Sequence, residues 1–256
     1  DPKRFPSGMK ALGDYIHARG LKFGIYSDAG LKTCGGRPGS WGYEYQDAKQ
    51  YAAWGVDYLK YDWCMASTQD ARSAYYIMSS ALQASGRDIV LSICEWGTSK
   101  PWLWADKVGN LWRTTGDIYD KWEGVRDYSS GVMNIVDKQV ELYPYARLGH
   151  WNDPDMLEVG NGGMTTEEYR SHFSLWAMLA APLIAGNDIA AMDAETKAIL
   201  TNRDVIAIDQ DPLGQQARRV SKAGDLEIWV RPLQGGGRAV VLVNRGPAPA
   251  PIRLDW

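Results

Sequence analysis

The sequence is poor in the residues that build disulfide scaffolds and metal centres. Its 256 residues include three cysteines, three histidines and three phenylalanines. No CxxC, HxH or HExxH spacing occurs, so the common kinds of zinc site are not expected. Three cysteines do not make a disulfide framework. One bridge with one free thiol remains open, and it would indicate an oxidising compartment.

Other absences exclude further classes of protein. No apolar run is long enough to span a bilayer. Neither GxGxxG nor GxxxxGK[ST] stands at a predicted strand end, and no GxSxG occurs, which argues against nucleotide binding and against a serine hydrolase. The formal net charge of −3 gives no basic footprint for nucleic acid. We therefore expect neither nucleic acid nor a membrane among the partners.

Two aromatic residue types are abundant. The chain has 12 tryptophans and 14 tyrosines. Their side chains combine a flat apolar face with a polar group, and such faces suit sugar rings. Part of them are expected to be ordinary core residues, so the composition favours carbohydrate binding without establishing it.

Short apolar segments alternate with amphipathic segments over the first two hundred residues. Alternation of this kind predicts βαβ units and a parallel sheet. A capping box is expected at Thr165 and Glu168. The predicted strands are 21–27, 56–63, 88–96, 110–116, 149–153 and 183–186. The predicted helices are 7–19, 45–54, 68–84, 165–180 and 192–200, with one more after residue 116.

Acidic residues at the predicted strand ends favour a (β/α)₈ TIM barrel over a doubly wound sheet. Barrel enzymes keep their chemistry at the carboxyl ends of the strands. Residues 226–230 and 239–243 then predict antiparallel strands. We expect a barrel over 1–214 and the start of an antiparallel β domain over 215–256. Only six barrel strands are predicted, so we expect the first two, and the tail of the β domain, to be missing from this chain. The strand-end acids are Asp28, Asp62, Glu95, Asp117, Asp153 with Asp155, and Asp188.

The segment 56–63 offers a candidate nucleophile. Alternate side chains of a strand share a face, so Tyr58, Lys60 and Asp62 are expected to point the same way. A neighbouring cation keeps a carboxylate ionised, as a nucleophile must be. The alternative interpretation is a structural ion pair between Lys60 and Asp62.

The segment 111–117 offers a second acid. Arg113, Thr115 and Asp117 share a face, and Asp117 is expected at the same rim as Asp62. Two carboxylates facing one cleft are what glycoside hydrolysis requires. The alternative is that Asp117 caps the following helix.

Two further segments contribute candidate binding residues. Asp155, in the run from His150 to Met156, could hold two vicinal sugar hydroxyls, although residues 152–155 are expected to form a turn. Glu95 could bind a hydroxyl, and Trp96 could stack on a ring or simply belong to the core.

These segments together resemble glycoside hydrolase family 27, the melibiase family of α-galactosidases and α-N-acetylgalactosaminidases, and most of all its bacterial or plant-type α-galactosidases. Seven motifs occur in the family's order over residues 1 to 214, which is far more specific than any one of them. They are DPKRFPSGMKAL, GLKFGIYSDAGLKTCGG, WGVDYLKYDWC, ICEWG, WRTTGD, WNDPDML and DVIAIDQDPLG.

The resemblance implies a retaining enzyme with Asp62 as nucleophile and Asp117 as acid/base. It implies a disulfide between Cys34 and Cys64 with Cys94 free, and no metal or organic cofactor. Glu95 would favour galactose over N-acetylgalactosamine. The other positions that line the sugar pocket would be Tyr26, Lys60, Trp96, Arg113, Asp155 and Met156.

One departure from the family leaves the sugar open. The adjacent Asp-Asp pair that binds the 4- and 6-hydroxyls of galactose would lie before residue 1. From the family resemblance and Glu95, the expected function is nevertheless that of an exo-acting α-galactosidase. The alternatives are a β-L-arabinopyranosidase or α-N-acetylgalactosaminidase of the same family, an inactive fragment, or a sugar-binding barrel without catalysis. We expect a galactoside as the partner and a secreted or periplasmic location. The sequence leaves the oligomeric state undetermined.

Overall fold

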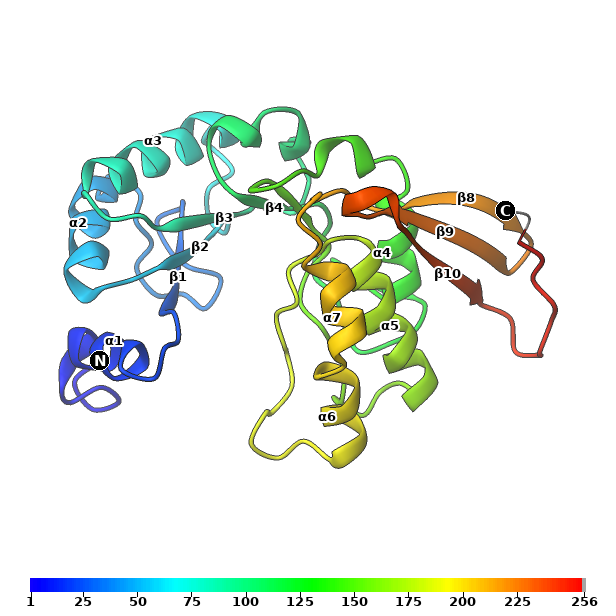
Figure 1. Ribbon diagram of the computed structural model, residues 1–256. Coiled ribbons are helices and arrows are strands. Elements are labelled where there is room, and N and C mark those ends of the chain that lie inside the picture. Colours follow the sequence, from blue (N-terminus) through cyan, green and yellow to red (C-terminus); the bar gives the residue numbers. More distant parts are fainter. Residues whose placement is uncertain (255–256) are drawn as a thin grey trace. The chain divides into compact units, whose positions relative to one another are not determined.

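The computed structural model describes residues 1–254. It divides into two compact units, Asp1–Arg113 and the chain from Thr114 onward (Figure 1). None of the described helices is long and apolar enough to cross a membrane.

The first unit is built around parallel strands. Helix α1 (Gly8–His17) comes first, and the strands follow in the order β1-β2-β3-β4. The crossover helices α2 and α3 lie side by side (Figure 1). The expected βαβ units are therefore confirmed in this unit. The bounds are β1 (Gly24–Asp28), α2 (Glu44–Trp54), β2 (Tyr58–Asp62), α3 (Ala71–Ala84), β3 (Val90–Cys94) and β4 (Leu111–Arg113), with 3₁₀ turns at Pro101–Leu103 and Ala105–Lys107.

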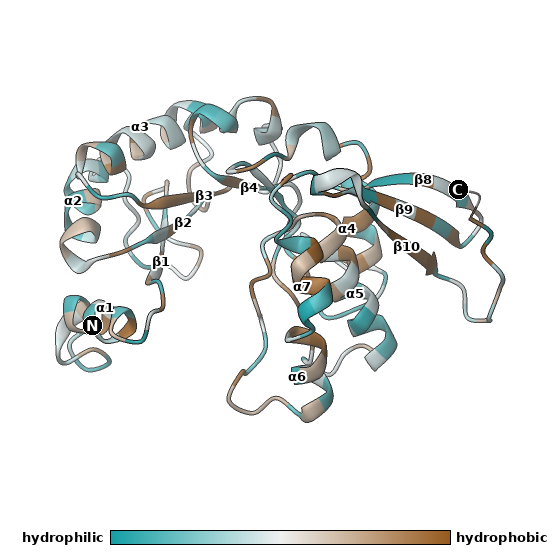
Figure 2. Ribbon diagram, in the orientation of Figure 1, coloured by the Kyte–Doolittle hydropathy of each residue, from teal (hydrophilic) through white to brown (hydrophobic). Residues whose placement is uncertain are grey.

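The strands of this sheet have two chemically different faces. In β2, the fully buried Leu59 and Tyr61 alternate with Tyr58 and Lys60, which are only half-buried. Tyr61 packs edge-on against Tyr75 of α3, whose hydroxyl donates to the Tyr61 carbonyl at 2.9 Å. One face of β2 thus serves the core, and the opposite face carries polar groups. Strands β3 and β4 are apolar along most of their length (Figure 2).

The second unit begins with a small hairpin and a set of helices. Thr165 caps α5 through a capping box, because its hydroxyl accepts from the Glu168 amide while Glu168 Oε2 accepts from the Thr165 amide at 2.7 Å. This capping box is as predicted. The bounds are β5 (Val125–Arg126), β6 (Ser129–Ser130), α4 (Val132–Gln139), a 3₁₀ turn at Tyr143–Tyr145, β7 (Trp151–Asp153), α5 (Thr166–Met178), α6 (Ala194–Leu200) and α7 (Arg203–Asp209).

An antiparallel sheet of order β10-β9-β8 completes the second unit. Trp229 of β9 is fully buried and belongs to the same hydrophobic core as Trp176 of α5 and Val136 of α4. The antiparallel strands expected after residue 215 are therefore present. Their bounds are β8 (Arg218–Ala223), β9 (Leu226–Pro232) and β10 (Arg238–Asn244), with a 3₁₀ turn at Gln234–Gly236.

Five charged residues tie this sheet to α4, and we call them the cationic cluster. Glu227 is fully buried, and its Oε1 lies 2.8 to 3.1 Å from nitrogens of three cationic side chains. Two of those cations also contact Asp137 of α4 at 2.8 Å. The cluster consists of Asp137, Arg219, Lys222, Glu227 and Arg245.

Two predicted strands are wrong in extent or kind. Residues 183–186 form no strand, because their backbone contacts go to the loop at Leu157 and amount to one isolated bridge between Leu157 and Ala185. The strand predicted to reach residue 116 ends at Arg113. Beyond it the chain turns at Gly116, where an added Cβ would lie 2.2 Å from the Tyr128 carbonyl oxygen.

Candidate active site

Asp62 ends β2, and its two carboxylate oxygens have different partners. Oδ1 accepts a hydrogen bond from the Trp63 amide at 2.9 Å, and Oδ2 accepts one from the Tyr26 hydroxyl at 2.8 Å. Burial and this hydrogen bond to Asp62 both raise the pKa of the Tyr26 phenol. Tyr26 therefore stays a proton donor to Asp62. The structure brings these two predicted site residues together.

A disulfide lies directly against this carboxylate. Cys34 and Cys64 are bonded, and Cys94 is a buried free thiol, as the family resemblance implied. The Cys34 sulfur lies 3.3 Å from Asp62 Oδ2. A disulfide sulfur carries no proton, so this is a packing contact that restricts where Asp62 can move.

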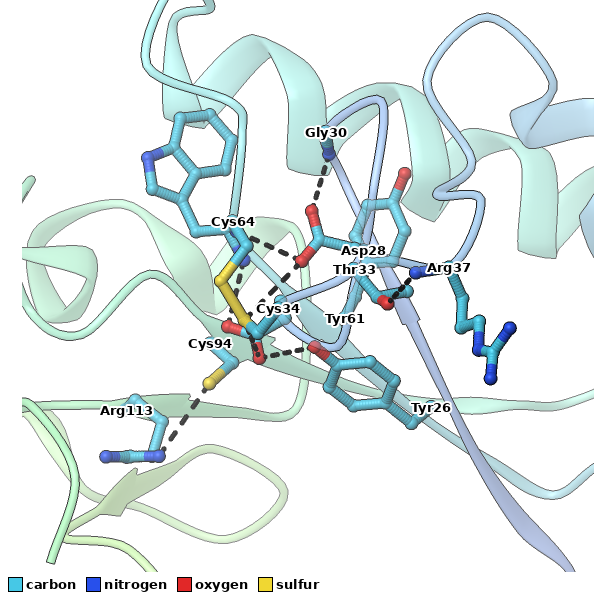
Figure 3. The surroundings of a disulfide bond; sticks show 12 residues. Tyr26, Asp28, Gly30, Thr33, Cys34, Arg37, Tyr61, Cys64, Cys94 and Arg113 are labelled. Atoms are coloured by element: carbon cyan, nitrogen blue, oxygen red, sulfur yellow. Dashed lines mark hydrogen bonds between the residues drawn. A yellow bond between two sulfur atoms is a disulfide. The ribbon is translucent and has the colours of Figure 1, made fainter.

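Asp28 is a second acid beside the disulfide, with its Oδ2 4.0 Å from the Cys34 sulfur. It ends β1 and pairs in register with Asp62. Its Oδ1 accepts from the Gly30 amide at 2.7 Å and its Oδ2 from the Cys64 amide at 3.0 Å (Figure 3). Burial, and to a lesser degree the charge of Asp62, raise the pKa of Asp28 to about 6, although the two amides oppose the shift. We call Tyr26, Asp28, Asp62 and the Cys34–Cys64 bridge the disulfide cluster.

The disulfide cluster has the spacing of a metal site but not its chemistry. Ligand atoms of Asp28, Cys34, Asp62 and Cys64 lie within 4.8 Å of one another. A metal would need cysteine sulfur as thiolate, and both sulfurs are consumed by the disulfide. The two aspartates that remain are each engaged by backbone amides.

Glu95 and Arg113 are both buried in the first unit. Glu95 Oε2 accepts from the Thr98 hydroxyl at 2.6 Å and from the Ser99 amide at 2.7 Å, while desolvation raises its pKa. Oε1 of Glu95 is buried without a hydrogen-bond partner among the described residues.

Arg113 Nη1 lies 3.7 Å from the Cys94 sulfur. Trp96 is half-buried, with a left-handed φ of 63° just after the end of β3.

In the second unit, the segments of Asp117 and Asp155 are joined. Asp155 Oδ2 accepts from the Ile118 amide at 2.9 Å, directly beside Asp117. Asp117 itself is half-buried, and its carbonyl accepts from Ser130 at 2.8 Å. Helix α4 begins after Gly131, so Asp117 is not its cap. Asp117 lies in irregular chain four residues beyond β4, which corrects its expected place at a strand end.

Asp155 is held in a strained backbone conformation. Its φ is 87°, an arrangement that residues other than glycine rarely adopt and that is concentrated at functional sites. The backbone there is fixed by Trp176 Nε1, which donates to the Asp155 carbonyl at 2.7 Å, and by Asp153 Oδ1, which accepts from the Asp155 amide at 2.8 Å. The turn predicted at residues 152–155 is wrong, because Asn152 and Asp153 belong to β7 and the chain becomes irregular only after that strand. The thioether of the next residue, Met156, lies beside Gly186.

Motif reasoning missed the residues that support these side chains. Trp63 stacks on Tyr75 with ring centroids 5.6 Å apart and fixes the end of β2. His172 is fully buried, which lowers its pKa to about 3, so Nε2 accepts from the Glu158 amide. Sequence spacing alone gives no signal for either contact, because both join residues more than ten positions apart.

A family model described as Alpha galactosidase A matches residues 1–211. The chain belongs to this family. A second model, the alpha galactosidase C-terminal beta sandwich domain, matches residues 223–256. Both matches agree with the resemblance carried by the seven motifs, and the expected class of a TIM barrel with a C-terminal antiparallel domain is confirmed.

Individual proteins are similar to this chain over nearly its whole length. Alpha-galactosidase A of Cellvibrio japonicus is 56% identical over 100% of this chain and 64% of its own length. An alpha-N-acetylgalactosaminidase of Gallus gallus is 45% identical over 96% of this chain and 62% of its own. The structure of Saccharomyces cerevisiae α-galactosidase with raffinose matches with a TM-score of 0.92 and 36% identity, over 96% of this chain and 61% of that one. The chain thus spans less than two thirds of the length of each of these three relatives.

Proposed function

We propose that this chain carries the catalytic centre of a retaining exo-glycosidase that releases terminal α-linked galactose, with Asp62 as nucleophile. The observation that carries this proposal is the setting of Asp62. Its carboxylate lies at the carboxyl end of a parallel strand, held by an amide, a phenol and a disulfide. Hydrogen bonds to a carboxylate favour its ionised form and fix its orientation, which suits attack on an anomeric carbon.

Asp117 is the acid/base of the proposed mechanism. In the first step it donates a proton to the leaving oxygen while Asp62 forms the glycosyl-enzyme bond. In the second step it removes a proton from water, which releases the sugar with its configuration retained. A retaining mechanism of this kind needs its two carboxyl groups about 5–5.5 Å apart. Two carboxyl groups and water suffice, so the proposal includes no metal or organic cofactor.

Galactose is the sugar that the relatives favour. The bacterial relative at 56% identity is named an α-galactosidase, and the yeast structure at 36% identity holds raffinose. Lys60, Trp96, Arg113, Asp155 and Met156 are proposed to line the sugar pocket. Thr98 and Ser99 engage only Oε2 of Glu95, so the proposed contact with a 2-hydroxyl is assigned to Oε1.

The disulfide supports a proposed secreted or periplasmic location. Structural disulfides persist in oxidising compartments and are rare in the cytosol. The Cys34 side of the bridge is exposed, so a reducing compartment would have direct access to it.

The proposal is tested with Asp62→Gly in the full-length protein, using Asp88→Asn, an exposed acid on the loop before β3, as the control. Turnover of an aryl α-galactoside should fall on the order of 10⁴-fold or more. Added azide should restore it and yield the β-galactosyl azide, because azide attacks from the face that Asp62 has vacated. Retained turnover, or an azide product of unchanged configuration, contradicts the assignment. If the wild type turned over an aryl α-N-acetylgalactosaminide or an aryl β-L-arabinopyranoside faster than the aryl α-galactoside, that sugar would replace galactose in the proposed function.

A further inference from the structure

The candidate nucleophile is not held by its own hydrogen bonds alone. The loop that follows β1, residues 29–41, leaves the sheet at Asp28 and is closed onto the end of β2 by the Cys34–Cys64 bridge. The amide of Ala29, the first residue of this loop, donates to the Asp62 carbonyl at 2.9 Å. The position of Asp62 therefore depends on the path that the loop takes.

Asp28 fixes that path at three points. Its carboxylate accepts from Gly30 at the start of the loop and from Cys64, the partner of the bridge. Its own carbonyl accepts from the Ser40 amide at 2.8 Å, where the loop returns. A fully buried aspartate that holds both ends of a loop and one half of its disulfide is a constraint on geometry, because few other arrangements satisfy all three contacts.

The loop has almost no freedom to relax around Asp28. A Cβ added at Gly30 would lie 2.0 Å from the Cys64 carbonyl oxygen, and one added at Gly39 would lie 2.1 Å from the Gly30 carbonyl oxygen. Backbone segments in such close contact transmit a displacement rather than absorb it. A change at Asp28 is thus passed on to Cys34, whose sulfur lies 3.3 Å from Asp62 Oδ2.

We propose that Asp28 is a positioning residue for Asp62, acting through the disulfide-closed loop that it anchors. The proposal rests on the proposed function only in taking Asp62 to be the nucleophile. Asp28 touches neither of the Asp62 carboxylate oxygens through a hydrogen bond of its own, so it is not itself a catalytic residue.

Protonation of Asp28 gives this arrangement a pH signature. With a pKa raised to about 6, mainly by burial, Asp28 becomes neutral in mildly acidic solution. A neutral carboxyl accepts hydrogen bonds more weakly than a carboxylate does. The ionisable groups that interact with it are Asp62 of β2 and the phenols of Tyr26 on β1 and Tyr61 on β2, and both phenols have raised pKa values.

The test compares Asp28→Asn with Asp209→Asn in the full-length protein. Asp209 is a matched control, because it is a buried aspartate whose pKa burial also raises to about 6, and it contacts Gln210 and Arg231. Three quantities are measured for each protein. They are kcat and KM for 4-nitrophenyl α-galactoside from about pH 4.5 to 7.5, the melting temperature, and the rate at which dithiothreitol reduces the Cys34–Cys64 bridge, followed by thiol alkylation.

For Asp28→Asn we expect kcat to fall about 10- to 100-fold with KM changed less than about threefold, because Asp62 is displaced while binding contacts remain. The wild-type decline in kcat as the pH falls through about 6 should be absent in the variant. Reduction of the bridge should be faster, on the order of tenfold, because its anchor is weakened. Asp209→Asn should change neither kcat with its pH profile nor the reduction rate, whatever its melting temperature.

Wild-type kcat with an unchanged pH profile in Asp28→Asn, whatever its melting temperature, overturns the proposal. If Asp28→Asn does not fold, Asp28→Glu replaces it, since it keeps the charge and displaces the carboxylate by one methylene. The glutamate variant should have a lower kcat but retain the decline of kcat at acidic pH, and an undiminished kcat overturns the proposal.

If the wild type hydrolyses no glycoside, the proposed function fails, and the rate of disulfide reduction alone then tests the role of Asp28. Faster reduction in Asp28→Asn then supports the anchoring role, and equal rates overturn it.

Discussion

The disulfide cluster of the first unit and the cationic cluster of the second each contain two acids. The pKa of Asp28 in the first cluster is raised, whereas the pKa values of both acids in the second are lowered. Asp28 is held by neutral backbone amides next to a second acid, Asp62, and burial raises its pKa to about 6. Glu227 is also buried, but the hydrogen bond from Trp229 and the cations Lys222 and Arg245 outweigh desolvation and lower its pKa. Asp137 responds to its arginines in the same way.

The difference separates two uses of a buried acid. An acid surrounded by fixed cations is locked in one charge state and contributes to the packing of an element, here α4 against the C-terminal sheet. An acid surrounded by neutral donors keeps a pKa close to the working pH and can respond to its surroundings, which is what chemistry requires. The contrast predicts that loss of a disulfide-cluster acid harms turnover, whereas loss of a cation-paired acid harms stability.

The largest effect that would sharpen this contrast concerns Asp117, an acid of the second unit that is proposed to be catalytic. Asp117→Ala should lower kcat/KM for raffinose about 10³-fold, because a sugar leaving group needs a proton donor. A nitrophenyl galactoside should lose far less in its first step, because its leaving group departs without protonation. The measurement is the ratio of kcat/KM for the two substrates. Asp127→Asn, on the exposed hairpin, is the control. Equal losses for both substrates would remove Asp117 from the acid role.

The next effect tests the cationic cluster. Glu227→Gln keeps the size of the side chain but leaves three cations facing a neutral amide, so the free energy of unfolding should fall by about 3 kcal/mol. Urea denaturation measures it, and Glu141→Gln, an exposed acid just after α4, should change it by less than about 0.5 kcal/mol. A variant of normal stability that has lost turnover would break the contrast, since it would give a cation-paired acid a catalytic role.

The smallest expected effect concerns Asp57. It tests whether the pKa of an acid is set by its hydrogen-bonding partners or by the unit in which it lies. Asp57 lies in the first unit but is paired with His17 and Arg87, each at 2.7 Å. Burial opposes its ionisation, yet the Phe23 amide and these two side chains lower its pKa to about 2, against an ordinary value of 3.8. Its stabilisation is therefore complete above about pH 4 and is lost as the pH falls toward 2.

Asp57→Asn should accordingly lower the free energy of unfolding by about 2 kcal/mol at neutral pH, with the difference from wild type shrinking between about pH 4 and 2. Denaturation at several pH values measures the difference, and turnover at neutral pH should be unaffected. A difference that grows as the pH falls would mean that the pKa of Asp57 is raised rather than lowered.

The sequence predicts the strands that position the site better than it predicts the chain between them. Strands β1, β2 and β3 begin and end within three residues of expectation, because buried apolar runs followed by an acid are a strong local signal. Strand β8 was missed, since RRVSKA is mostly exposed and is held as a strand by its hydrogen bonds to β9. Helix α7 was also missed, although Asn202, which caps it through the amides of Asp204 and Val205, offered a sequence signal.

The candidate site was likewise predicted only where its residues lie on strands. The position of Asp62 on its strand follows from a period of two. Tyr26 was expected only from the family resemblance, and its contact with Asp62 was not predicted. Asp28 was expected only as one acid among several at the strand ends. Its role depends on Gly30, Ser40 and Cys64, which come together only through a returning loop and a bridge between residues 30 positions apart in the sequence. Contacts of that kind have no local pattern.

The two crowded glycines of the 29–41 loop also restrict how this segment can evolve. Neither Gly30 nor Gly39 has room for even a methyl group, because backbone oxygens occupy the space. Substitution is tolerated instead at positions whose side chains face solvent, such as Lys32 and Arg37. Mutational drift should therefore change the charge on the outer surface of the loop while its course, and with it the placement of Asp28 and Asp62 beneath it, stays the same.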